Sequence, residues 1–139
     1  MVNPEKIRAK ISVIEENLGK LDELRQLPAD EFKKDFRNIE AAKHLLQVSI
    51  EAMTDIGTHI ISRMRLKIPA TNADVFRTLS ENGYIPGNHL DKFILMTRFR
   101  NKIVHFYVKV TPDEIYNILQ EDLPDFKLFI SDVLKKNLL

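Results

Sequence analysis

The spacing of apolar residues is the feature that most restricts what this chain can fold into. Near its start, isoleucine and leucine recur at intervals of four, three, four and three, at Ile7, Ile11, Ile14, Leu18 and Leu21. This period places all five side chains along one face of an α-helix, suited to packing against one long neighbour. Asn3-Pro4 supplies an N-cap and a proline at the first helical position. We therefore expect a long amphipathic helix that Pro28 ends.

The next apolar stripe is longer and broader. It predicts a helix over residues 30–64, one wide enough to touch more than one neighbour. A single helix of that length would span about 50 Å, so a break near residues 35–38 is also compatible with the pattern. Gly57 stands inside this segment, where glycine costs about 1 kcal/mol relative to alanine. A close helix crossing, within the chain or across a dimer, is the expected reason.

Three shorter helices complete the predicted fold. One should follow Thr71-Asn72, one should hold residues 96–107, and Thr111-Pro112-Asp113-Glu114 is a full start signal for the last. Pro124 should kink or break that last helix. No strand alternation is visible, and the 139 residues contain only four glycines. We predict an all-α, up-and-down bundle of four to five helices that forms a single domain over residues 1–139.

Composition excludes several classes of function. The chain has no cysteine, so disulfides, thiolate catalysis and cysteine-bound zinc are excluded. It carries no signal-peptide pattern and no stretch of about 18 apolar residues, and we expect a cytoplasmic protein without a membrane span. The net charge is only +1, but two segments carry a local excess of basic residues. Residues 56–73 hold Arg63, Arg65 and Lys67 and no acid, and residues 91–109 hold five basic residues against one acid. Both segments fit either an anionic partner or simple solvation of helix faces.

The second basic segment contains the densest group of functional side chains. Read as a helix, it gathers the apolar residues Leu95, Met96, Phe99, Ile103 and Phe106 on one arc. A separate arc holds a guanidinium, a carboxamide, an imidazole and a phenol, from Arg100, Asn101, His105 and Tyr107. The apolar arc should face the core. The polar arc is the candidate functional site, unless it is only a solvated helix surface.

The arrangement Arg100-Asn101-(three residues)-His105-Phe106-Tyr107, on the fourth helix of a chain of this length, resembles the HEPN superfamily. It is most similar to the HepT toxins of toxin–antitoxin modules, which carry arginine, a polar residue, three more residues, histidine, any residue and tyrosine. The resemblance covers nearly the whole chain. The segment from Asp55 to His59 and the Thr-Pro-Asp-Glu start also look like that family. Phe106 fills the free position, where relatives commonly carry a basic residue.

This resemblance implies a homodimeric, HEPN-like, metal-independent endoribonuclease that needs no cofactor and acts as the toxin of a type VII module. The two motif helices would face each other across a cleft that binds the RNA substrate. The partner would be a minimal nucleotidyltransferase, an antitoxin that neutralises the toxin by transferring AMP to the motif tyrosine, Tyr107. Adding AMP there would set a phosphate beside Arg100 and fill the cleft with adenosine.

Cleavage of RNA without a metal suits these side chains. An imidazole titrates near neutral pH, so His105 is the candidate acid or base, and a dimer would bring two such groups to one phosphate. Arg100 offers a fixed fork of donors for the charge of the transition state. Asn101 can orient His105 or donate to a phosphate oxygen. Candidate RNA contacts come from the flanking cations, Arg98, Lys102 and Lys109.

Other readings stay open at this point. The chain could be a non-catalytic helical partner that presents a substrate to a nucleotidyltransferase, or a purely structural helical dimer. Asp55 and His59, four residues apart on one helix face, fit either a metal or assisting site or a plain hydrogen bond. Arg63, Arg65 and Lys67 fit either an RNA or partner surface or solvation.

Overall fold

The computed structural model describes residues 1–105, 108–136 and 138, and over this range every regular element is a helix. The elements are α1 (Pro4–Arg25), α2 (Ala29–Lys34), α3 (Phe36–Arg63), α4 (Asn72–Glu81), the short 3-10 helix η1 (Gly87–His89), α5 (Leu90–Val104), α6 (Pro112–Glu121) and α7 (Pro124–Leu134). The predicted all-α bundle is confirmed. The described residues form seven α-helices where four to five were predicted, because the second and last predicted helices are each divided in two. The divisions lie at Asp35 and before Pro124, where the sequence allowed a break and predicted a kink or break.

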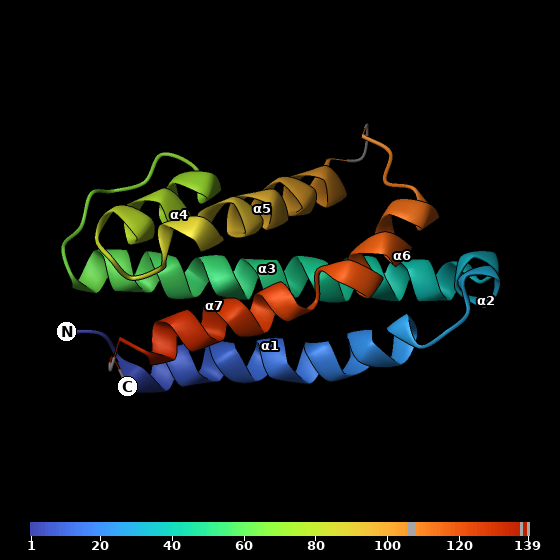
Figure 1. The fold of residues 1–139 in the computed structure, drawn as a ribbon, viewed down its shortest axis with the longest axis horizontal. Helices are drawn as coiled ribbons and strands as arrows, with labels where there is room; N and C mark the ends of the chain where they lie inside the picture. The colour runs from blue at the N-terminus through green and yellow to red at the C-terminus, as the bar shows by residue number, and fades with distance from the viewer. Residues whose placement is uncertain (106–107, 137, 139) are drawn as a thin grey trace.

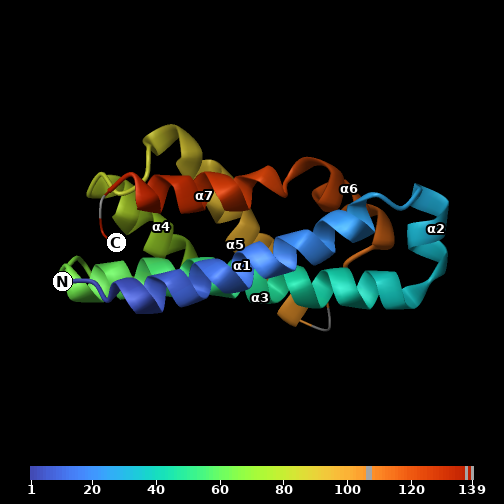
Figure 2. The same cartoon turned by 90° about the horizontal axis from the view of Figure 1, so that it is seen from below.

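Helix α3 is the central element of the bundle. It contacts α1, α2, α4, α5 and α6. Figure 1 shows α1 running along one side of α3 in the opposite direction, with α4 and α5 on the other side and α7 lying across the front. Seen from below in Figure 2, α1 and α3 lie side by side, and the end of α5 emerges beyond α3. The two long helices therefore form a base on which the shorter ones pack.

Side-chain caps begin the helices where the sequence predicts. The Asn3 carboxamide oxygen accepts the backbone N–H groups of Glu5 and Lys6, at 3.1 and 3.3 Å. The Thr71 hydroxyl accepts the N–H of Asp74 at the start of α4, and the Thr111 hydroxyl does the same at α6. Each of these bonds satisfies a donor that the helix itself leaves unpaired. Three of the predicted starts are thus confirmed.

The core fills the space between α3 and the shorter helices. The predicted apolar stripe of α1 is buried along its whole length, with every member 8% exposed or less. Phe76, Phe93 and Phe129, from α4, α5 and α7, form a ring cluster with centroids 5.3 to 5.9 Å apart. Close by, the buried carboxylate of Asp132 lies 2.8 Å from Nδ1 of His89. This polar contact fixes α7 against the start of α5.

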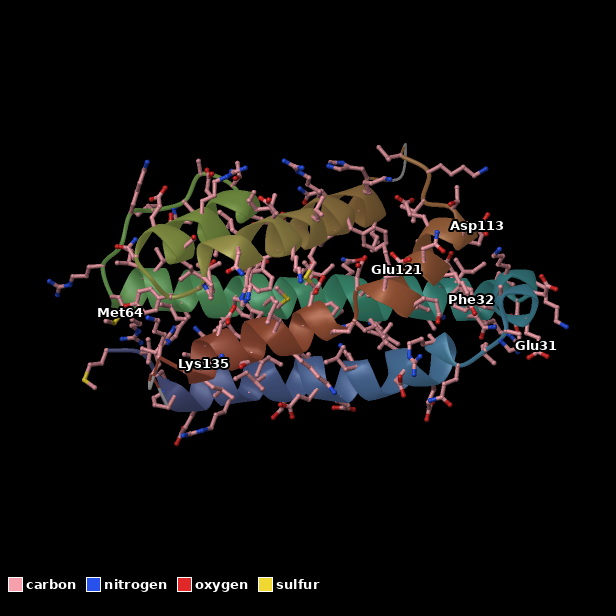
Figure 3. All side chains as sticks on the ribbon, in the orientation of Figure 1. Glu31, Phe32, Met64, Asp113, Glu121 and Lys135 are labelled. Carbon is pink, nitrogen blue, oxygen red and sulfur yellow. The ribbon has the colours of Figure 1, made fainter. Side chains whose placement is uncertain are left out.

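A second contact region fixes the opposite end of the bundle. Figure 3 labels Phe32 and Asp113 there, where α2 meets the start of α6. The fully buried Phe32 packs against Tyr116 with ring centroids 5.4 Å apart, and Lys33 forms an ion pair with Asp113. The Tyr116 hydroxyl donates to the backbone oxygen of Leu27 at 2.9 Å. These contacts hold the short α2 in place and tie α6 to it.

Gly57 marks the crossing of α4 over α3. A Cβ atom at this position would lie 2.6 Å from Cγ1 of Val75 and 3.1 Å from Cδ1 of Leu79. Both neighbours come from α4, so the close crossing expected from the sequence is confirmed and lies within the chain. The absence of a side chain lets the two helices approach closely at this point.

We expect Gly57→Ala to lower the free energy of unfolding by about 1–3 kcal/mol, because the added methyl forces α4 away from α3. Urea denaturation followed by circular dichroism measures this. Gly19→Ala is the matched control, because Gly19 lies inside α1 and a Cβ atom added there would meet no neighbouring atom within 4 Å. That change should stabilise the protein by about 0.5–1 kcal/mol. Equal stabilisation by both substitutions would contradict the crossing argument.

Candidate functional site at the end of helix α5

The motif lies where α5 ends. The helix stops at Val104, and His105 adopts extended backbone angles, φ −95° and ψ 101°. The N–H of His105 still donates to the backbone oxygen of Asn101 at 3.2 Å, which closes the last turn. The predicted helix over residues 96–107 is therefore confirmed as far as Val104 and wrong at the exposed His105, which stands just past the helix end. Residues 103–108 are all β-branched or aromatic, and such residues favour helix weakly.

The buried face of α5 differs in one residue from the predicted arc. Met96 and Phe99 are buried and Ile103 packs against the core, but Leu95 is 59% exposed. The buried face also includes Phe93, Ile94 and Thr97, which centres it away from Leu95. Leu95 thus lies at the edge of the face and meets solvent in the isolated chain. The predictions made for Phe106 and Tyr107 lie outside the described residues.

Arg100 is held by an acid on α3. Its Nε and Nη2 groups both donate to Oε2 of Glu51, at 3.0 and 2.6 Å. The two side chains are 25% and 35% exposed. Arginine has five N–H donors, and this pair fixes one edge of the guanidinium plane. Glu51 is a member of the site that the sequence reading missed, because nothing in the sequence alone aligns α3 with α5.

Asn101 extends this group. Its side-chain oxygen accepts Nη1 of Arg100 at 3.3 Å, so the predicted arginine and asparagine are brought into contact. Through this bond Asn101 supports the guanidinium. The roles expected from the sequence, orienting His105 or donating to a phosphate oxygen, stay predictions. Charge-assisted donors on a half-exposed helix end are suited to holding an anionic group. The arrangement therefore offers a positioned cation near the end of α5 and an exposed imidazole just past that end.

The flanking cations are in different situations. Lys102 forms an ion pair with Glu114 of α6, with Nζ and Oε1 2.6 Å apart. Arg98 and Lys109 are exposed. An anionic ligand could reach the last two directly, whereas contact with Lys102 requires it to compete with Glu114.

Asp55 and His59, the other candidate pair on α3, make structural contacts with α1 and the residue before it. Nε2 of His59 accepts the backbone N–H of Asn3 at 2.9 Å, and Asp55 pairs with Lys10 at 2.9 Å. Burial lowers the pKa of His59, and the nearby charges of Lys6 and Arg63 lower it further. Among the described residues no group of three or more His, Asp or Glu side chains is placed to hold a metal ion. The same residues contain no helix long and apolar enough to cross a bilayer.

Comparison with known proteins shows the class to which this all-helical bundle belongs. The model of the family described as "Ribonuclease HepT-like" matches residues 14–133. The chain is therefore a member of the HepT-like ribonuclease family.

Individual relatives agree with this assignment. The tRNA nuclease HepT of Aphanizomenon flos-aquae is 21% identical over 132 residues, which cover 95% of this chain and 90% of that protein. Among solved structures, a toxin–antitoxin complex with AMP-PNP contains a chain with a TM-score of 0.88 and 28% identity, covering 94% of this chain and 98% of that one. The tri-AMPylated HEPN toxin of Shewanella oneidensis, in complex with its MNT antitoxin, has a TM-score of 0.87 and 29% sequence identity. The match covers 94% of this chain and 97% of that one.

A double-mutant cycle tests whether Glu51 holds Arg100. We expect Glu51→Gln and Arg100→Gln to show a coupling of about 1 kcal/mol in the free energy of unfolding, because the pair is partly shielded from water. The control cycle is Lys10→Gln with Asp55→Asn, a more exposed pair with side chains 38% and 54% exposed. Its coupling should be a few tenths of a kcal/mol. A Glu51–Arg100 coupling no larger than the control would remove the anchoring role.

Proposed function

We propose that the chain is a toxin endoribonuclease that cleaves RNA without a metal ion, with its active site at the end of α5. The observation that carries the proposal is the placement of Arg100. In a member of a ribonuclease family, its guanidinium is held by Glu51 and Asn101 about one helical turn before the chain leaves the helix at His105. The A. flos-aquae relative, a tRNA nuclease, supports RNA as the substrate class.

The proposed reaction needs only proton transfers and charge stabilisation. A histidine removes the proton of a ribose 2′-OH, and that oxygen attacks the adjacent phosphorus. The bond between phosphorus and the 5′-oxygen breaks, and a second acid protonates the leaving oxygen. The products are a 2′,3′-cyclic phosphate and a free 5′-hydroxyl. Arg100 stabilises the negative charge that builds on the phosphorus oxygens in between.

A homodimer supplies the second acid. Each chain carries one motif histidine, and a two-fold axis brings His105 of both copies to one cleft. The exposed Leu95 on α5 supports this arrangement, because it gives the motif helix an apolar residue to bury against a second copy. In the isolated chain Glu51 neutralises much of the charge of Arg100. A substrate phosphate must therefore share the guanidinium with that carboxylate.

Substitution of the two motif residues tests the mechanism. We expect His105→Ala to lower kcat by about 10²–10⁴-fold and Arg100→Ala by about 10²–10³-fold. Cleavage of a fluorescent RNA measures this, in buffer with EDTA and with end-group analysis for the cyclic phosphate. Lys20→Gln, an exposed charge change on α1, is the control and should keep full activity. Activity of both motif variants equal to that of the control would refute the assignment.

We further propose that a partner nucleotidyltransferase inactivates the chain by transferring AMP to Tyr107. The AMPylated state of the S. oneidensis toxin in complex with its MNT antitoxin supports this form of regulation. A phosphate attached there would bring a competing anion to Arg100. Intact-mass measurement after incubation with the cognate nucleotidyltransferase and ATP should show a gain of one or more AMP units. The gain should vanish in Tyr107→Phe, and its persistence in that variant would exclude this residue as the acceptor.

A second candidate is a non-catalytic partner of the nucleotidyltransferase. The neutralising contact between Glu51 and Arg100 favours it, since a paired cation is less available to a phosphate. The two candidates separate in one experiment. Cleavage by the free dimer that resists EDTA supports the enzyme, whereas tight complex formation with no cleavage supports the binding partner.

A further inference from the structure

A second basic surface lies at the C-terminal end of α3, where the start of α1 meets it. Here the protein has a hollow of about 790 Å³. Four cationic side chains line it: Lys6 and Lys10 from α1, Arg63 at the end of α3, and Arg65 just after that end. We call this site the basic hollow. Figure 3 labels Met64, which stands between its two arginines in the sequence, at the end of α3 far from Asp113.

The charges of the basic hollow are largely unbalanced. Asp55 is the one acid among its lining residues, and Lys10 neutralises it through a 2.9 Å ion pair. Within the part of the chain that the structure describes, Lys6, Arg63 and Arg65 form no ion pair, and all three are exposed. The hollow thus gathers three uncompensated cations. Such a group attracts an anion rather than a neutral ligand.

The walls of the basic hollow are fixed by backbone contacts. The bond from the Asn3 N–H to His59 ties the first turn of α1 to α3, and Asn3 also caps that turn at Lys6. The first turn of α1, which carries Lys6, is therefore held against α3. His59 is only 8% exposed, and this burial and the charges of Lys6 and Arg63 lower its pKa. Its titration reports the positive potential of this corner.

Arg65 occupies a backbone position that favours glycine. Its φ is +56°, and it is the one non-glycine residue with a positive φ among the described residues. The N–H of Leu66 donates to the oxygen of Ile61 at 2.9 Å and that of Arg65 donates to Ser62 at 3.4 Å, which is the Schellman pattern for ending a helix. A left-handed arginine costs about 1 kcal/mol there relative to glycine. The chain carries arginine here in spite of this strain, and its guanidinium lines the basic hollow. Strained residues of this kind gather at functional sites, which favours a role of Arg65 in binding.

One exposed face of α3 connects the basic hollow to the motif. Residues at intervals of four, three and four share this face: Glu51, Asp55, Thr58 and Ser62. Glu51 holds Arg100 and Asp55 holds Lys10, while Thr58 and Ser62 line the hollow. The eleven residue steps from Glu51 to Ser62 span about 16 Å of helix. That distance corresponds to about five stacked nucleotides at roughly 3.4 Å each.

We infer that the basic hollow binds the phosphodiester backbone of the substrate RNA, several nucleotides away from the phosphate held at Arg100. The inference rests on the proposed ribonuclease function and extends it with a second contact on the same strand. Backbone phosphates suit the hollow because most of its lining side chains are cations or hydroxyls, and Met1 is the one apolar side chain among them. Three or four such contacts bind without regard to sequence and become weaker as salt rises.

Binding of RNA that cannot be cleaved tests the inference. The probes are 2′-O-methyl oligouridylates, one a trinucleotide and one of about twelve nucleotides, long enough to span both sites. For the double variant Arg63→Gln/Arg65→Gly we expect the Kd of the longer probe to rise about tenfold. The slope of log Kd against log salt should fall by about 1.4, or 0.7 for each lost contact. Trinucleotide binding should stay unchanged.

The matched control removes the same charge elsewhere. Lys20→Gln/Lys34→Gln changes two exposed cations on α1 and α2, far from the basic hollow, and should leave the Kd of the longer probe within about twofold. Arg65→Gly also relieves strain, so the single variant should not lower Tm, and a loss of binding cannot be ascribed to unfolding. Equal binding of the longer probe by the hollow variant and the control would overturn the inference.

A second measurement follows His59 by NMR. The longer probe should raise the pKa of the His59 imidazole, because bound phosphates favour its charged form, whereas the trinucleotide should not. An unchanged His59 titration on saturation with the longer probe would overturn the inference. So would loss of the nucleotidyltransferase complex in Arg63→Gln/Arg65→Gly with RNA binding intact, since the surface would then belong to a protein partner. Because the probes lack a 2′-OH, these results do not depend on whether the chain cleaves RNA.

Discussion

Helix α3 contacts its neighbours through different faces, and the rest of the structure depends on the contacts that these faces make. Its apolar stripe packs against α1, while Gly57 removes a side chain so that α4 can cross closely. Glu51, on a third face, meets α5 and holds Arg100. What remains exposed is a narrow polar stripe. A helix that is used on this many sides leaves little freedom for its neighbours to shift, which makes it a firm support for functional groups.

This support matters because the functional groups themselves lie at helix ends. His105 stands just past the end of α5, and Arg100 stands just before the last turn, which carries Lys102. A helix end is free to fray unless something outside the helix restrains it. The Glu51 contact provides that restraint from α3, and the Lys102–Glu114 pair provides a second one from α6. The position of the guanidinium is thus set by tertiary contacts more than by the helix that carries it.

The fold was largely predictable from local signals. The stripe of α1, the caps at Asn3 and Thr111, and the glycine of the crossing each have a direct physical reading in the sequence. Helix ends without a glycine or proline were not predictable in the same way. The weak helix formers after Ile103 are a signal for the stop at Val104, but the spacing of apolar residues continued past it.

The site was predictable in its residue types and only partly in its geometry. The spacing of Arg100, Asn101 and His105 singled them out, yet it could not show that a carboxylate 49 positions earlier pairs with the arginine. Nor could it show that Leu95 lies at the edge of the buried face, because that depends on how α5 is turned against α3. Contacts between helices are set by packing of the whole bundle, which a helical period does not specify.

The distance between Arg100 and the basic hollow decides how the two could act together. About 16 Å of helix separates them along α3, which is roughly twice the Debye length of 8 Å at physiological ionic strength. The cations of the hollow therefore do not stabilise charge on the phosphate that reacts beside His105. Their contribution has to come through binding of a strand that reaches both places. Loss of the hollow should accordingly appear in KM for long RNA, whereas loss of Arg100 appears in kcat, because only the guanidinium meets the charge of the transition state.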